Sequence, residues 1–75
     1  MSEAVLTADQ WIVLAAVDDA DYRGLNLYEV MHATSHRPTA YMAAQELVQL
    51  GLVCEAHGRW YITQGGHAMA AVRHE

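Results

Sequence analysis

The chain has 75 residues, of which 53% are hydrophobic, and a formal net charge of −5 at pH 7. This length allows a single domain, 1–75, with a marginal core, because so short a chain buries only about 60% of its unfolded surface. Only four residues are basic, all of them arginines, against nine acidic residues. This balance of charge disfavours strong non-specific binding to nucleic acid.

Several features exclude a membrane or disulfide-bonded protein. The longest apolar run, Trp11 to Val17, is far shorter than the roughly 18 residues of a membrane span. The N-terminus lacks the basic start and apolar stretch of a signal peptide, so we expect a cytoplasmic protein with no membrane contact. The single cysteine, Cys54, cannot form an intrachain disulfide, and we expect it to be buried in a strand.

The first predicted element is a helix that follows a short arm, 1–6. Thr7 and Gln10 have the spacing of a capping box, which favours a helix start at this point. The next two turns are apolar on all sides, which predicts that one side faces the core and another a second subunit. The end of this helix is acidic (Asp18, Asp19 and Asp21) and is expected to be solvated and frayed, because carboxylates there oppose the helix dipole.

A second helix is predicted over 27–33, after Gly24 interrupts the chain. Asn26 is a favoured N-cap residue, and Glu29 follows three residues later. A polar turn over 34–37 separates this helix from the next.

The third predicted helix covers about 37–50. Pro38 suits its first turn, where a missing N–H costs nothing, and Gly51 suits a left-handed C-cap. At 100° per residue one face of this helix is apolar and is expected to face the core. That face consists of Ala40, Ala43, Ala44, Leu47 and Leu50.

After Gly51 the pattern changes to that of a β-hairpin. Segments 52–56 and 59–62 are predicted strands, and His57-Gly58 between them is a tight turn. Thr63 is the expected cap of a last short helix that begins near Gly65 and Gly66.

Four segments in this order resemble the PadR-like and MarR-like winged helix-turn-helix regulators. They are Leu6-Thr7-x-x-Gln10-Trp11-x-x-Leu14, Tyr28-Glu29-Val30-Met31, the run from Thr39 to Val53, and Trp60-Tyr61-Ile62-Thr63-Gln64-Gly65-Gly66. The resemblance implies an α+β winged helix-turn-helix fold with three helices, a two-stranded β-wing and a short C-terminal helix. It also implies sequence-specific DNA binding and transcription regulation, with helix 37–50 in the major groove and the wing, 54–61, beside it.

The candidate DNA contacts lie on the outer face of the third helix and on the wing. Gln45 is suited to adenine, Met42 or the Thr39 methyl to a thymine methyl, and Arg59 to a groove beside the wing. The predicted contacts are Arg37, Pro38, Thr39, Tyr41, Met42, Gln45 and Arg59. A homodimer interface is expected on the first and last helices, at Trp11, Val13, Met69 and Val72.

The same face also fits a second function. Tyrosine and methionine are enriched where proteins bind one another, and lysine is depleted there. A winged-helix module that binds protein and not DNA, as an assembly subunit or an acidic inhibitor from a phage or mobile element, therefore remains open. We expect no enzyme and no cofactor, since the sequence has no glycine-rich phosphate loop and no evident activating partner for Cys54. We also expect no metal site, since His32 and His36 are four residues apart across a helix boundary, without other ligands at suitable spacing.

Overall fold

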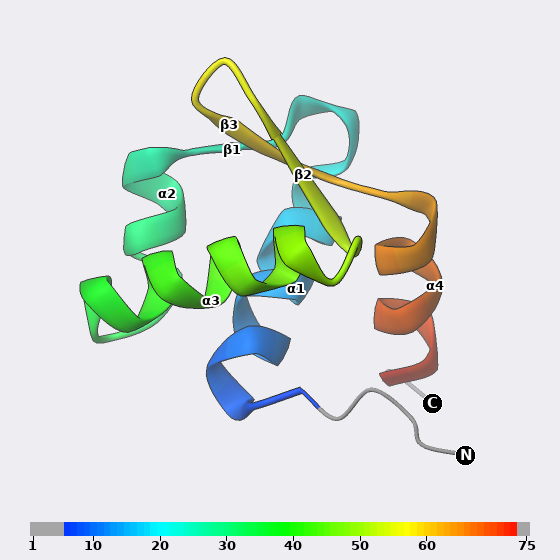
Figure 1. Ribbon diagram of the computed structural model, residues 1–75, viewed down its shortest axis with the longest axis horizontal. Helices are drawn as coiled ribbons and strands as arrows, with labels where there is room; N and C mark the ends of the chain where they lie inside the picture. The colour runs from blue at the N-terminus through cyan, green and yellow to red at the C-terminus, as the bar shows by residue number, and fades with distance from the viewer. Residues whose placement is uncertain (1–5, 74–75) are drawn as a thin grey trace.

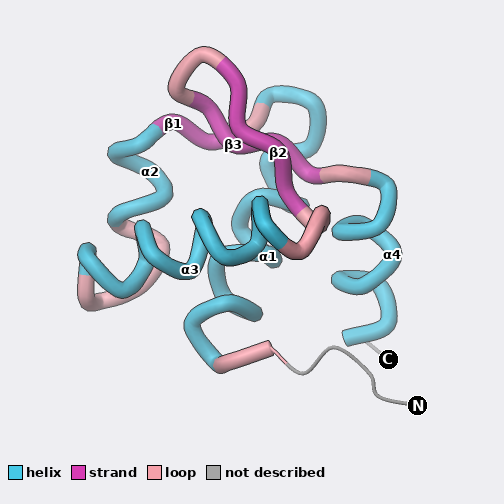
Figure 2. The backbone as a smooth tube through the Cα atoms, viewed as in Figure 1, coloured by secondary structure: helices cyan, strands magenta, loops and turns pink. Residues whose placement is uncertain are grey.

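The computed structural model describes residues 6–73, which form an α+β fold of four α-helices and one three-stranded antiparallel sheet (Figure 1). The elements in chain order are α1 (Ala8–Ala20), the 3₁₀ turn η1 (Asp21–Arg23), β1 (Leu25–Asn26), α2 (Leu27–Met31), α3 (Arg37–Gln49), β2 (Val53–Ala56), β3 (Arg59–Ile62) and α4 (Gln64–Arg73). The sheet lies along one side of the helices (Figure 2). Apart from Leu6, the predicted N-terminal arm lies outside the described residues.

The predicted start of α1 is confirmed, and the helix ends within the predicted acidic stretch. The Thr7 hydroxyl accepts a hydrogen bond from the Gln10 N–H at 3.1 Å, and Gln10 Oε1 accepts one from the Thr7 N–H at 2.9 Å. The helix runs to Ala20, and Asp21 is its C-cap. Asp18, near this end of the helix, also contacts another element: its carboxylate lies 2.7 Å from His67 Nδ1 on α4. The acidic end of α1 is therefore also a tertiary contact.

Helices α2 and α3 follow the predicted boundaries closely. Asn26 and Glu29 form a second capping box, with N–H to oxygen distances of 2.8 and 2.9 Å. Helix α2 ends at Met31, two residues earlier than expected. Gly51 adopts the predicted left-handed conformation, with φ of +78°.

The core face of α3 is confirmed at four of its five predicted positions. Ala40, Ala43, Ala44 and Leu47 are buried. Leu50 is an exception: it occupies the C-cap, where the chain leaves the helix, and its side chain is exposed.

The sheet has one strand more than predicted. Strand β1 pairs with β3, with Leu25 opposite Trp60, so that the strand order is β1-β3-β2. Two residues are too few to show the alternating pattern by which a strand is recognised in a sequence. Cys54 was expected to be buried but is exposed, because successive residues of a strand face opposite sides and its neighbour Val53 faces the core.

The core lies between α1, α3 and the sheet. Its largest fully buried side chains are Val13, Leu14, Val17, Val30, Leu47 and Val53. Each such side chain stabilises the fold by about 1.5–3 kcal/mol relative to exposure. Val13, predicted at a dimer interface, is thus enclosed by its own chain and has no surface for a second copy. Over residues 6–73 no helix has both the length and the apolarity to span a membrane.

Candidate nucleic-acid interface

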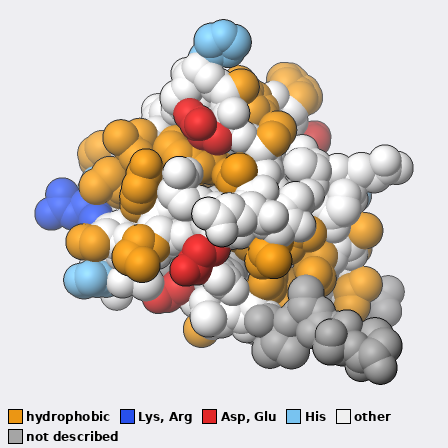
Figure 3. Space-filling view, viewed as in Figure 1, with side chains coloured by type: hydrophobic (Ala, Val, Ile, Leu, Met, Phe, Trp, Pro, Cys, Tyr) orange, Lys and Arg blue, Asp and Glu red, His pale blue; other side chains and the backbone are white. Residues whose placement is uncertain are grey.

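The outer face of α3 carries most of the predicted contact residues. We define the reading face as Arg37, Pro38, Tyr41, Met42 and Gln45. Because the opposite side of α3 packs into the core, these positions lie on the outer side of the helix, where the first four are exposed and Gln45 is half-buried. Apolar side chains cover much of this side of the molecule, and acidic side chains lie among them (Figure 3).

Arg37 and Pro38 form the first turn of α3. The Arg37 side chain is exposed and has no hydrogen bond or ion pair to any described residue. Proline at this position leaves no unsatisfied N–H. Thr39, in contrast, is less available than predicted, because its hydroxyl is hydrogen-bonded to the ring of His36 just before the helix.

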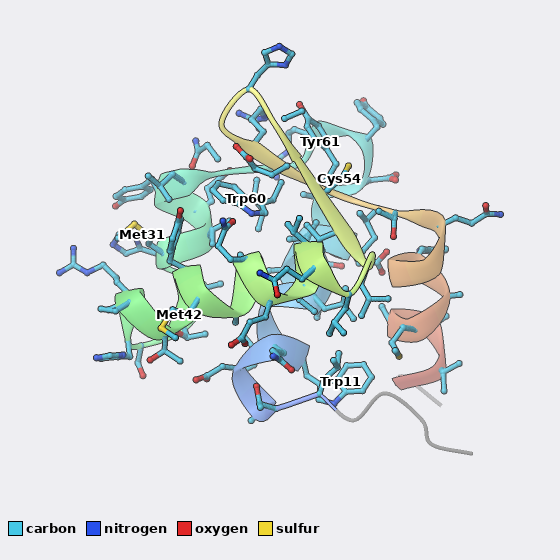
Figure 4. The ribbon with its side chains drawn as sticks, viewed as in Figure 1. Trp11, Met31, Met42, Cys54, Trp60 and Tyr61 are labelled. Atoms are coloured by element: carbon cyan, nitrogen blue, oxygen red, sulfur yellow. The ribbon has the colours of Figure 1, made fainter. Side chains whose placement is uncertain are left out.

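Tyr41 and Met42 form the middle of the reading face. The Tyr41 ring meets the Trp60 ring edge to face, with 6.1 Å between centroids. Trp60 is only 3% exposed and lies between the sheet and α3 (Figure 4), so it holds Tyr41 in place from β3. Met42 is 59% exposed and is free to meet an apolar group.

Gln45 does not present the atoms that a contact with adenine needs. Its Oε1 is buried and has no hydrogen-bond partner. A bidentate contact with adenine uses both the carbonyl and the amino group of the side chain. In this conformation Gln45 therefore cannot make the expected contact with adenine.

The prediction that Arg59 projects from the hairpin tip is wrong: its side chain turns back into the fold. Its Nε donates to the Arg23 carbonyl at 3.1 Å, and Nη2 donates to the Gly24 carbonyl at 3.3 Å. These bonds tie β3 to the segment before β1. The tip itself consists of His57 and Gly58, both with positive φ, as a two-residue hairpin turn requires.

The first half of α3 and the turn before it are free of acidic residues. None of the nine acidic residues lies between Val30 and Gln45, whereas Arg37 and two histidines do. The positive end of the α3 dipole lies in the same place. Away from this region, Arg23 lies 3.4 Å from Glu29. A hydrogen bond from the Asn26 N–H, assisted by Arg23, lowers the pKa of Glu29, so this carboxylate stays charged.

Sequence reasoning missed two features beside the reading face. Glu46 accepts a hydrogen bond from Gln10 Nε2 at 2.6 Å, which joins α3 to α1. On α2, Leu27 is 45% and Tyr28 69% exposed. The Tyr28 ring also packs on His32, at 4.1 Å between centroids. No local signal indicates the bond between Gln10 and Glu46, because it depends on how α1 and α3 are placed relative to one another. The contact between Tyr28 and His32 is local, since residues four apart are neighbours on a helix.

The described part of the chain contains no cluster of three or more residues arranged to hold a metal ion. The ring of His32 is hydrogen-bonded to the Tyr28 carbonyl, and that of His67 contacts Asp18. These histidines thus have structural partners.

Comparison with protein families, with curated proteins and with solved structures gave no match. The function is therefore inferred from the chain's own residues and geometry.

Proposed function

We propose that this protein is a winged helix-turn-helix regulator that binds specific DNA sequences as a homodimer. In this proposal α3 is the recognition helix and the β2–β3 hairpin is the wing. One observation carries the proposal: the exposed first half of α3 lacks acidic residues and carries Arg37 at the positive end of the helix dipole. That end of a recognition helix contacts base edges in helix-turn-helix proteins.

Three exposed residues of the reading face, Arg37, Tyr41 and Met42, contact DNA in this proposal. Arg37 binds a phosphate or a guanine at the edge of the half-site. Met42 and the Tyr41 ring contact thymine methyl groups. The wing contacts the neighbouring backbone through His57 and the turn amides, since Arg59 is engaged within the fold.

The homodimer is part of the proposal because a single protomer has few cations available to contact DNA. One protomer makes about two phosphate contacts, so its affinity is low and its salt dependence shallow. Two protomers on one duplex double these contacts and read two half-sites. Ile12 on α1 and Val72 on α4 are exposed apolar residues suited to the contact between protomers.

The test is selection of duplexes from a random pool at about 50 mM salt. We expect an enriched inverted repeat and a loss of about tenfold in affinity for Arg37→Ala, the effect of removing one good base or phosphate contact. Arg23→Ala is the matched control, because it removes the same charge away from the reading face. Absence of an enriched sequence, or equal losses in both variants, contradicts the proposal.

A second candidate function is the binding of a protein. It is favoured by the exposed apolar side chains of Leu27, Tyr28 and Met42 beside Arg37. This surface suits a partner with an apolar anchor and a carboxylate opposite Arg37. Failure of the DNA selection, together with capture of a partner that Tyr28→Ala abolishes, favours this function.

A further inference from the structure

Glu46 is the acidic residue of α3, and it borders the reading face. It follows Met42 by four residues, so the two side chains lie on neighbouring turns of one helix face. The residue is exposed. A carboxylate here would repel the phosphates of a duplex docked on α3.

The Glu46 carboxylate is held by Gln10 in the first turn of α1. Gln10 Nε2 donates to Glu46 Oε1 at 2.6 Å. In Figure 4, Met42 points to the side of α3 on which α1 begins. The hydrogen bond therefore ties Glu46 to α1, at the edge of the reading face.

The capping box of α1 determines the direction of this bond. Gln10 Oε1 already accepts from the Thr7 N–H, so the amino group of the same amide must point toward Glu46. Gln10 thus satisfies the start of α1 and presents a fixed donor to α3. The two contacts together fix which way the amide faces.

We infer that Gln10 is a positioning residue for DNA recognition: it holds the Glu46 carboxylate against α1 and away from the docked phosphates. This inference rests on the proposed function. In it, Gln10 does not contact DNA itself but affects the affinity of the reading face for DNA through Glu46.

The key variant is Gln10→Glu. Glutamate keeps the capping box, because its carboxylate still accepts from the Thr7 N–H, but it removes the donor and repels Glu46. The released carboxylate should weaken binding to a duplex of about 20 base pairs, two helical turns, by about fivefold at about 50 mM salt. Thr7→Asp is the control: it adds the same charge and preserves the N-cap but leaves the Gln10 donor in place. Its loss should be under about twofold.

The double variant Gln10→Glu with Glu46→Gln provides a rescue. Residue 46 then supplies the donor and residue 10 the acceptor, and the net charge equals that of the wild type. Affinity should return to within about twofold of the wild type. The loss in Gln10→Glu relative to the wild type should also shrink as the salt concentration is raised, because it comes from charge repulsion, and a merely structural role for Gln10 would not produce this salt dependence. Circular dichroism melting verifies that each variant is folded at the assay temperature.

Two outcomes overturn the inference while leaving the proposed function intact. One is equal affinity of Gln10→Glu and Thr7→Asp on a duplex that the wild type binds. The other is a double variant that binds as weakly as Gln10→Glu. A wild type that binds neither the selected duplex nor a mixed-sequence one overturns the proposed function, and the inference with it.

Discussion

Gly66 lies where the first turn of α4 crosses the backbone of Leu52. A Cβ atom at this position would lie 1.9 Å from the Leu52 carbonyl oxygen and 2.8 Å from Ile62 Cδ1. No side chain fits such a gap, so only glycine allows α4 to pack directly on the chain that enters β2. This single residue determines how closely the last helix approaches the sheet.

Replacing Gly66 with alanine should lower the free energy of unfolding by about 2 kcal/mol or more, because the clash is with backbone that cannot move freely. Gly65→Ala is the control, since its nearest neighbour is the Gly51 carbonyl oxygen at 3.9 Å. That substitution should be neutral or stabilising by up to about 1 kcal/mol, the helix preference of alanine over glycine. Urea unfolding of the two variants measures the difference, and equal stabilities would contradict this account of Gly66.

Local spacing predicts the roles of capping residues well at this scale. Thr63 was predicted as a cap, and its hydroxyl accepts a hydrogen bond from the Gly66 N–H at 3.0 Å. The requirement for glycine at 66 was not predicted, because it depends on Leu52, fourteen positions away in the chain. The prediction for Arg59 is wrong for the same reason, because its side chain binds the carbonyls of Arg23 and Gly24. The prediction for Gln45 is wrong because its Oε1 is buried.

At the scale of elements, α1 and α4 are joined by an ion pair between Asp18 and His67. The hydrogen bond and the charge of Asp18 raise the pKa of His67 above the ordinary 6.5, and the more distant Asp21 acts in the same direction. The pair is exposed, so its contribution to stability is small. It nevertheless links the two helices proposed to form the dimer.

The raised pKa predicts how this link depends on pH. The stability that His67 contributes is fully present below pH 6.5, the unfolded value, and is lost as the pH rises through the folded pKa. The difference in unfolding free energy between the wild type and His67→Gln should therefore be larger at about pH 5.5 than at about pH 8.5. Chemical denaturation at both values measures it. A difference that grows toward alkaline pH would show that the Asp18 contact does not control His67.

Elements with strong local signals were predicted correctly, and elements stabilised by their neighbours were not. Helix α3 has a proline near its start, a left-handed glycine after its end and an apolar stripe, all readable in order. Strand β1 exists because Leu25 and Asn26 pair with β3. Strand β2 is an edge strand because it pairs with β3 alone, and Cys54 is exposed because its neighbour Val53 faces the core.

At the scale of the whole molecule, the surface has fewer available cations than a typical DNA-binding domain. Of the three arginines with described side chains, Arg23 pairs with Glu29 and Arg59 binds backbone carbonyls, which leaves Arg37. A net charge of −5 adds long-range repulsion from DNA. In the proposed function, recognition of DNA therefore depends on association of two protomers more than it would for a basic domain.

We expect a dimer of about twice 8.3 kDa at micromolar concentration in sedimentation equilibrium. Val72, which is 70% exposed on α4, is the residue whose replacement by aspartate should give a monomer. Tyr22→Asp is the control, because it places the same charge on the exposed turn η1. A wild-type mass of 8.3 kDa would show that the apolar surface of α1 and α4 does not bind a second copy.

The sequence by itself determined the helix starts, the left-handed glycine, the hairpin turn and the core face of α3. These depend on residues within a few positions of one another, whose hydrogen bonds and preferences are local. Only the tertiary structure decided that Val13 is buried, that the Arg59 side chain turns inward and that Gln45 Oε1 is buried. It also placed Gln10 against Glu46 and brought Trp60 under Tyr41. Such contacts join residues far apart in the chain, so they exist only once α1, α3 and the sheet have packed together.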